Sequence, residues 1–252
     1  VTPHRRGARV PNPGHQALGR LVSAAALISL AASAPACAQG DEHRDRRLEM
    51  VRTQIGARGV EDPATLAAMR SVPRHEFVPP ALVEEAYSDR PLPIGEGQTI
   101  SQPYIVAFMT EQLALGSGDK VLEVGTGSGY QAAVLAALGV EVFTIEIVES
   151  LARSAEARLA RLGYDVTVRH GDGYLGWPEE APFDAVIVTA APDNIPQPLI
   201  DQLRPLGRMI VPVGPANGAQ QLVLLRKEED GSIRAEAVLP VRFVPFVRDS
   251  QR

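Results

Sequence analysis

Three glycines at alternate positions, preceded by an acidic residue, form the most informative short motif in this chain. Glu123 is followed by Gly125, Gly127 and Gly129, after an apolar run that predicts a buried strand and before a segment that predicts a helix. A glycine turn between a strand and a helix N-terminus is where nucleotide-like ligands bind in α/β sheets. The motif therefore indicates a ligand site, although an ordinary tight strand–helix turn could contain the same glycines.

The spacing and charge of this motif favour a cationic cofactor. The dinucleotide fingerprint G-x-G-x-x-G would place its last glycine at Tyr130, so the pattern of NAD-binding proteins fails here. The Glu123 carboxylate would repel a pyrophosphate, whereas it suits a ligand that carries an ammonium and a sulfonium group. We therefore expect S-adenosyl-L-methionine rather than NAD as the cofactor, bound by Glu123 and the three glycines of the turn.

Two further acidic residues follow at the ends of the next two predicted strands. Glu146 comes directly after the apolar run 140–145 and 21 residues after Gly125, where a carboxylate can accept hydrogen bonds from both ribose hydroxyls. Asp172 lies between two glycines after the following strand and can accept a hydrogen bond from the adenine amino group. Glu146 could also be a solvated charge at a helix start, and Asp172 a turn-forming residue. Because all three acidic sites fall at consecutive strand ends, we expect Glu146, Asp172 and Gly173 to bind the cofactor.

The elements that would hold these residues alternate along the chain as in an α/β sheet. Predicted strands and helices alternate over residues 120–205. Three closing strands then follow, over residues 207–213, 221–226 and 237–243. This order predicts a layered α/β domain, and 252 residues provide ample material for its core.

The residues before this alternation predict short helices joined by irregular segments. Apolar spacing at Leu48, Val51 and Ile55 predicts one helix, and Asp62 followed by a proline opens a second helix that runs to Met69. Three prolines in the next eight-residue stretch exclude a regular element there.

A predicted loop over residues 95–103 leads into a helix over 103–115, and residues 87–93 are also predicted to be irregular. Ser101 and Gln102 lie at the N-terminal cap of that helix, where free backbone amides favour negative charge. Ser101 could be a plain helix cap, or its hydroxyl and the neighbouring amides could orient an anionic group of a substrate.

Composition excludes several classes of partner. A hydrophobic content of 45% and a charged content of 22% are typical of a globular protein. The net charge of −5 argues against a nucleic-acid partner, and aromatic residues, at 5%, offer few stacking platforms for bases. The five histidines are scattered and Cys37 is the single cysteine, so we expect no metal site. We also expect no stable membrane association and a monomer.

The first 40 residues differ in character from the rest of the chain. Arginines without any acidic residue precede an alanine-rich apolar segment over 21–38, and small residues then fit an A-x-A cleavage site before Gln39. Residues 1–40 therefore predict a signal-like leader. An over-extended gene start, read from Val1, and a lipid anchor on Cys37 are the alternatives.

We expect a single folded domain over residues 48–246, after a charge-rich boundary at 41–47. The localisation of this domain is open on sequence grounds. Because S-adenosyl-L-methionine is made in the cytosol, we expect the cytoplasm, while the signal-like segment 21–38 makes the periplasm the alternative.

Several longer motifs resemble those of the protein-L-isoaspartate O-methyltransferases. The matching motifs lie at residues 74–79 (RHEFVP), 86–89 (AYSD), 98–103 (QTISQP), 122–130 (LEVGTGSGY), 171–173 (GDG), 188–192 (VTAAP) and 206–214 (LGRMIVPVG). The glycine turn is shared by many methyltransferases, whereas the Thr-Ile-Ser-Gln-Pro sequence is far more specific to this family. The resemblance covers residues 48–246. The leader departs from the family pattern, because members are typically cytosolic and begin close to the first helix.

This resemblance implies both a fold and an activity. The fold is the Rossmann-like fold of S-adenosylmethionine-dependent methyltransferases, with a seven-stranded, mostly parallel sheet flanked by helices. The activity is methyl transfer from S-adenosyl-L-methionine to the carboxylate of L-isoaspartyl residues in damaged proteins and peptides. The ester then collapses to a succinimide, part of which hydrolyses to normal aspartate, so the enzyme repairs proteins.

The resemblance also assigns roles to individual residues. Ser101 matches the serine of the family's active site, and Thr99 in the same loop is expected to contact the cofactor. Gln221 matches a family position near the cofactor, but the adjacent Gln220 leaves the register open. A carboxylate is already a competent nucleophile at neutral pH, and the sulfonium methyl is already activated. Alignment and desolvation therefore supply most of the rate, without a metal or a strong base.

Two alternatives to protein repair stay open. A methyltransferase for another carboxylate or a small molecule would share the cofactor residues and differ only in its substrate. A noncatalytic cofactor-binding module would have lost active-site residues, whereas Ser101, Glu146 and Asp172 are all present here.

Overall fold

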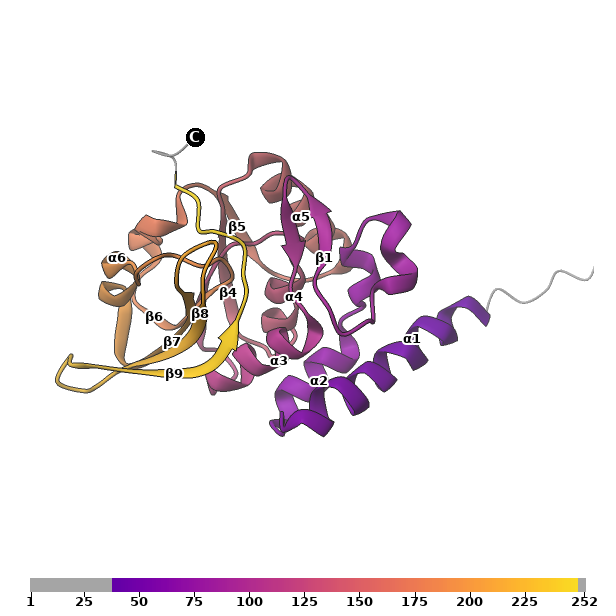
Figure 1. The fold of residues 1–252 in the computed structure, drawn as a ribbon, viewed down its shortest axis with the longest axis horizontal. Coiled ribbons are helices and arrows are strands. Elements are labelled where there is room, and N and C mark those ends of the chain that lie inside the picture. Colours follow the sequence, from indigo (N-terminus) through magenta and orange to yellow (C-terminus); the bar gives the residue numbers. More distant parts are fainter. Residues whose placement is uncertain (1–37, 249–252) are drawn as a thin grey trace, which may run out of the picture. The chain divides into compact units, whose positions relative to one another are not determined.

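Seven strands form one sheet in the computed structural model, which describes residues 38–248 (Figure 1). The strands are β3 (Lys120–Val124), β4 (Glu141–Glu146), β5 (Thr167–His170), β6 (Phe183–Val188), β7 (Leu203–Val213), β8 (Gln220–Lys227) and β9 (Ile233–Val241). They lie in the order β5-β4-β3-β6-β7-β8-β9, in which the first five are mutually parallel and the last two pair antiparallel. The predicted seven-stranded, mostly parallel sheet is confirmed. The predictions for residues 1–37, including Cys37, lie outside the described residues.

Helices connect the parallel strands and cover the sheet on both faces. These helices are α4 (Tyr130–Ala136), α5 (Glu149–Leu162) and α6 (Gln197–Asp201). Because side chains alternate along a strand, β3 contributes Val121 to one apolar cluster and Leu122 and Val124 to the other. Leu135 of α4 packs in the first cluster, and Leu199 of α6 packs in the second. The alternation thus fixes which strand residues remain available at the strand ends for a ligand.

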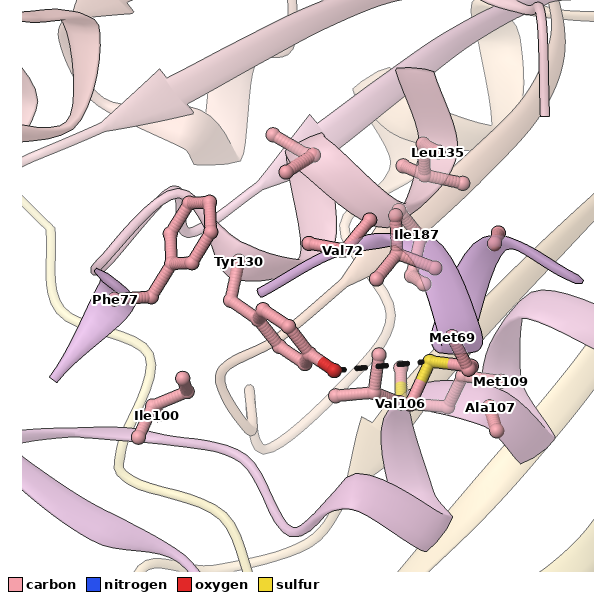
Figure 2. Close-up of a cluster of buried hydrophobic side chains, with 14 of the residues drawn as sticks. Met69, Val72, Phe77, Ile100, Val106, Ala107, Met109, Tyr130, Leu135 and Ile187 are labelled. Atoms are coloured by element: carbon pink, nitrogen blue, oxygen red, sulfur yellow. Dashed lines mark hydrogen bonds between the residues drawn. The ribbon is translucent and has the colours of Figure 1, made fainter. Parts of the chain in front are cut away.

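The chain before the sheet forms helices that pack on the first of these clusters. The longer ones are α1 (Ala38–Met50), α2 (Pro63–Ser71) and α3 (Pro103–Gln112). Met69 and Val72, at the end of α2, lie against Met109 of α3 and Tyr130 of α4 (Figure 2). The Tyr130 hydroxyl donates to the Met69 sulfur at 3.9 Å. This packing holds α3, and with it the segment around Ser101, against the sheet.

The predicted short helices are confirmed, with one difference in extent. The Asp62 carboxylate caps α2 by accepting a hydrogen bond from the backbone N–H of Thr65 at 2.7 Å. The first helix begins at Ala38, so the charge-rich segment 41–47 lies within α1. Tight helical turns fill the segments between the longer elements. They are a π-helical turn at Val51–Ile55 and 3₁₀ turns at Gly56–Arg58, Arg74–Phe77, Pro80–Glu85, Gly173–Leu175 and Pro178–Glu180.

The prediction of a plain loop over residues 95–103 is wrong in part. Strands β1 (Leu92–Gly95) and β2 (Gln98–Ile100) form an antiparallel hairpin there. Glu96 and Gly97 make its turn with φ values of 53° and 69°. Strands of three or four residues are too short to show an alternating pattern, so tertiary packing decides their pairing. Among residues 38–248, no helix is long and apolar enough to span a membrane.

Candidate active site

The glycine turn after β3 has a backbone that only glycine adopts without strain. Gly125 and Gly127 have φ values of 101° and 52°. A Cβ atom on Gly125 would clash with the hydroxyl of Thr189, which donates to the Gly125 carbonyl at 2.6 Å. Gly129 then caps α4, so the turn delivers the chain directly into a helix N-terminus. The predicted strand–turn–helix unit is confirmed, and its backbone leaves open space at the sheet edge.

Glu146 is anchored at the end of β4, next to this turn. Its two carboxylate oxygens accept hydrogen bonds from the backbone N–H groups of Gly127, at 2.8 Å, and Val148, at 2.9 Å. The residue is only 5% exposed. A solvated charge at a helix start would be exposed and mobile, so that alternative is excluded. Glu146 instead presents a fixed carboxylate, whose remaining lone pairs can accept further hydrogen bonds.

Glu123 lies deeper, within β3, and is fully buried. One carboxylate oxygen accepts a hydrogen bond from the Thr144 hydroxyl at 2.5 Å, and the other has no partner among the described residues. Burial raises the pKa of Glu123 to about 8, with a smaller contribution from the charge of Glu146. The Glu123 carboxyl is therefore largely protonated at neutral pH, and the fixed negative charge beside the turn belongs to Glu146.

Asp172 stands after β5 and forms a turn. Its carboxylate accepts a hydrogen bond from the backbone N–H of Tyr174 at 3.0 Å, and its other oxygen lies 3.4 Å from the Arg248 side chain. Asp172 is thus a turn-forming residue, which was one of the two roles expected for it. Asp172 is not among the described residues that line the cavity of about 310 Å³ at the ends of the parallel strands, whereas the adjacent Gly173 is. A Cβ atom on Gly173 would clash with Val124, so only glycine fits between β3 and this turn.

A cavity of about 310 Å³ opens at the carboxyl ends of the parallel strands. It is lined by the glycine turn, the end of β4, Gly173, Thr189 and the segment 244–247. Among the described residues that line it, Glu96 and Glu146 are the charged ones, so this cavity is acidic. Ligands of open α/β sheets bind in this position, and the volume is within the range of small-molecule sites.

Thr99 lies between this acidic cavity and a second one, which Ser101 also lines. The second cavity has a volume of about 670 Å³ and is lined by the hairpin, the start of α3 and the end of β9. Thr99 lines both cavities, and Ser101 lines the second. Gln102 is the N-cap residue of α3, and no side chain caps this helix. A capping role therefore does not account for the Ser101 hydroxyl.

Thr189, which follows β6, was not singled out from the sequence. It lines both large cavities, and its hydroxyl also donates to the carbonyl of Val124 at 3.1 Å. A third cavity, of about 30 Å³, has Ser101, Glu123 and Thr189 in its lining. The position of Thr189 after a predicted strand was the available signal, since strand ends converge at this edge of the sheet.

The structure distinguishes Gln220 from Gln221. Gln220 is buried, and its side-chain amide pairs with the backbone of Phe243, accepting from its N–H at 2.6 Å and donating to its carbonyl at 3.3 Å. Gln221 is exposed on β8 and is not among the described residues that line any of these three cavities. Gln220 thus holds the backbone of Phe243 in the segment after β9, and residues of this segment line both large cavities.

Two adjacent cavities of this kind suit a transfer between two bound molecules. Thr99, Thr189 and Val244 line both, so ligands in them would meet at these residues. Within the described part of the chain, no three His, Cys, Asp or Glu side chains are grouped to hold a metal ion. The side chains at the meeting point are hydroxyl and aliphatic groups, which can orient reactants and exclude water.

Comparison with known proteins identifies the chain's relatives. Residues 45–251 match the family model described as protein-L-isoaspartate(D-aspartate) O-methyltransferase. The protein-L-isoaspartate O-methyltransferase of Gloeobacter violaceus is 59% identical over 201 residues, covering 79% of this chain and 98% of the relative. Protein-L-isoaspartate O-methyltransferase 2 of Syntrophobacter fumaroxidans is 54% identical over 231 residues, covering 87% of this chain and 93% of the relative.

Solved structures show the same similarity in three dimensions. One protein-L-isoaspartate O-methyltransferase superimposes with a TM-score of 0.71 at 30% identity, covering 80% of this chain and 65% of that one. A structure from Plasmodium falciparum, assigned as a protein-L-isoaspartate O-methyltransferase, also has a TM-score of 0.71, at 25% identity, and covers 81% of this chain and 99% of that one. That protein is in complex with S-adenosyl-L-homocysteine.

Proposed function

The chain belongs to the protein-L-isoaspartate(D-aspartate) O-methyltransferase family, and from this membership we propose that its two adjacent cavities are the cofactor site and the substrate site of that activity. The protein is a methyltransferase that uses S-adenosyl-L-methionine and methylates the carboxylate of L-isoaspartyl residues in damaged proteins and peptides. The proposal rests on one observation: an acidic cavity lies next to a cavity that is lined by hydroxyl groups.

The acidic cavity fits S-adenosyl-L-methionine. The fixed carboxylate of Glu146 supports a contact with the ribose hydroxyls, and the open backbone at Gly125 and Gly127 gives room that a side chain would fill. Gly129, Glu123, Asp172, Gly173 and Thr99 complete the proposed cofactor residues. Gln221 was also predicted as a cofactor residue, and its exposed position on β8 speaks against a contact with the cofactor. Gln220 supports the site only indirectly, through the backbone of Phe243. When bound, the cofactor supplies an activated methyl group and a sulfonium leaving group.

The second cavity receives the isoaspartyl carboxylate, and Ser101 is the proposed catalytic residue. Its hydroxyl does not cap α3, and Ser101 lines the cavity together with Thr99 and Thr189. A hydroxyl in this position can donate to one carboxylate oxygen and leave the other free to attack. No proton has to move, because the carboxylate is ionised at neutral pH. Orientation and exclusion of water are therefore the chain's main contributions to the rate.

Some expectations concern the whole protein rather than the site. We propose that it acts in the cytoplasm as a monomer, because its cofactor is made there and because the two cavities lie within a single chain. N-terminal sequencing of the native protein tests the location: a start at Gln39 in a periplasmic fraction would overturn it. Light scattering at micromolar concentration tests the monomer.

Labelled S-adenosyl-L-methionine and a matched pair of peptides test the activity. The two peptides differ only in an isoaspartyl or an aspartyl residue at one position. We expect strong labelling of the isoaspartyl peptide and background labelling of the other, since the extra methylene in the isoaspartyl backbone moves the carboxylate. Equal labelling of both would indicate a general carboxyl methyltransferase, and labelling of neither would contradict the repair activity.

A further inference from the structure

The two large cavities carry opposite charge. Among the described residues that line the proposed cofactor cavity, the charged ones are Glu96 and Glu146. Among those that line the proposed substrate cavity, the charged one is Arg242. An acidic cavity suits a sulfonium and an ammonium group, and a basic one suits a carboxylate. The charge pattern therefore matches the two reactants, and Arg242 is the cation on the substrate side.

Arg242 is held at the edge of the substrate cavity by its neighbours in sequence. It directly follows β9, whose last residue, Val241, pairs with Gln220. The next residue, Phe243, is clamped through both its N–H and its carbonyl by the buried Gln220 side chain. The backbone at Arg242 is thus fixed on both sides, while its side chain is exposed.

The guanidinium group of Arg242 is available for a ligand. Among residues 38–248, no carboxylate forms an ion pair with it and no acceptor forms a hydrogen bond with it. By contrast, Arg234, within β9, is paired with Glu228 at 2.8 Å. An arginine without an internal partner in the lining of a cavity retains its full capacity to bind an anion.

We infer that Arg242 is a docking residue that attracts and holds the isoaspartyl carboxylate as the peptide enters the substrate cavity. This inference rests on the proposed function of the two cavities. It assigns the negative charge of the substrate to a specific cation, whereas Ser101 orients the carboxylate for attack.

The step that Arg242 assists is binding rather than methyl transfer. A close ion pair with the attacking oxygen would lower its nucleophilicity, so contact through the reaction would slow the enzyme. An exposed guanidinium at the cavity edge instead raises the rate and strength of encounter, and salt screens this effect. Loss of Arg242 should therefore change KM and its dependence on ionic strength, and leave kcat nearly unchanged.

Steady-state kinetics of Arg242→Gln with a blocked peptide test the inference. The peptide is acetylated and amidated, and its isoaspartyl carboxylate is its only anion. We expect KM for the peptide to rise about three- to tenfold at low ionic strength, the scale of a partly solvated charge pair. The difference from wild type should shrink in 0.5 M NaCl. The KM of Arg242→Lys should lie between those of the wild type and Arg242→Gln, since lysine keeps the positive charge and lacks the planar guanidinium group.

Arg234→Gln is the matched control, because it removes the same charge from β9, eight residues before Arg242 and outside the cavity lining. Its KM should equal that of wild type. Unchanged affinity for S-adenosyl-L-methionine in calorimetry shows that Arg242→Gln is folded. A wild-type KM in folded Arg242→Gln, or an equal rise in Arg234→Gln, overturns the inference. Failure of the wild-type protein to methylate the peptide would instead contradict the proposed function.

Discussion

The proposed cofactor cavity and the proposed substrate cavity are built in different ways, although Thr99, Thr189 and Val244 line both. The cofactor cavity is formed largely by the carboxyl ends of parallel strands in the centre of the sheet, with Glu146 held by two backbone amides. The substrate cavity is formed by a short hairpin, the start of α3 and the segment after β9. The first rests mainly on strand ends that the sheet brings together, with the hairpin and the segment 244–247 at its border. The second is formed mainly by segments about 140 residues apart in the chain. Substitutions in the two cavities should therefore affect different measured quantities.

The largest expected effect concerns stability on the cofactor side. In the folded protein the pKa of Glu123 is about 8, against an ordinary value of 4.5. Between these values the folded chain holds a proton that the unfolded chain has released, so this residue's contribution to stability is complete below pH 4.5 and is lost as the pH rises to 8. Glu123→Gln should remove this loss. At pH 8 its free energy of unfolding should exceed that of the wild type by roughly 2–5 kcal/mol.

Denaturant unfolding at pH 5 and pH 8, without cofactor, measures this difference. The relative stability of Glu123→Gln should increase between the two pH values. Parallel pH profiles for the two proteins would mean that Glu123 titrates normally. In that case Glu123 and Glu146 would both be charged at neutral pH. The negative charge beside the glycine turn would then not belong to Glu146 alone.

The next effect belongs to the substrate side. Ser101→Ala should lower turnover on an isoaspartyl peptide roughly ten- to a thousandfold, equal to about 1.4–4 kcal/mol of transition-state stabilisation. Affinity for S-adenosyl-L-methionine should barely change. Ser101→Thr, which keeps the hydroxyl, should retain more activity than Ser101→Ala. Normal turnover of Ser101→Ala would reduce Ser101 to a residue of the loop without a role in the reaction.

Glu146→Ala should produce the reverse pattern. It removes a carboxylate that the backbone amides of Gly127 and Val148 hold in place, and we expect a loss of about 1–3 kcal/mol in cofactor affinity. Calorimetry with S-adenosyl-L-methionine measures it. Glu156→Ala, an exposed site on α5, is the control and should bind normally. An unchanged affinity for S-adenosyl-L-methionine in folded Glu146→Ala would show that Glu146 does not contribute to cofactor binding.

The smallest effect is expected at Asp172. Asp172→Asn should weaken cofactor binding by less than about 1 kcal/mol, because an amide oxygen can still accept hydrogen bonds from Tyr174 and from adenine. Asp172→Ala should be more damaging, since it loses both the turn and the acceptor. Calorimetry of both variants decides between these outcomes. Equal losses for the two would show that the negative charge itself matters, and Arg248 is the cation that contacts it.

The sequence brought together several residues of the acidic cavity for a physical reason. Parallel strands bring their carboxyl ends to one edge of the sheet, so Glu146 and Gly173 could be placed together without knowledge of the fold's details. The protonation of Glu123 could not be predicted, because it depends on how completely the neighbouring strands and Thr144 exclude water.

The contacts of the proposed substrate cavity could be predicted from the sequence only in part. Neighbouring residues on a strand point to opposite faces, so only one of Gln220 and Gln221 can reach Phe243, and the register decides which. Thr189 and Arg242 meet Ser101 only after the whole sheet has formed. The Thr-Ile-Ser-Gln-Pro sequence identified Ser101 through a family resemblance, whereas the hairpin that carries Thr99 gave no periodic signal.

A crystal structure with S-adenosyl-L-homocysteine and an isoaspartyl peptide tests the division between the two cavities most directly. We predict that the ribose lies against Glu146 and that the isoaspartyl carboxylate lies beside Ser101, with Thr99 and Thr189 between the two ligands. A peptide carboxylate bound away from Ser101, or a nucleoside bound away from Glu146, would contradict this account.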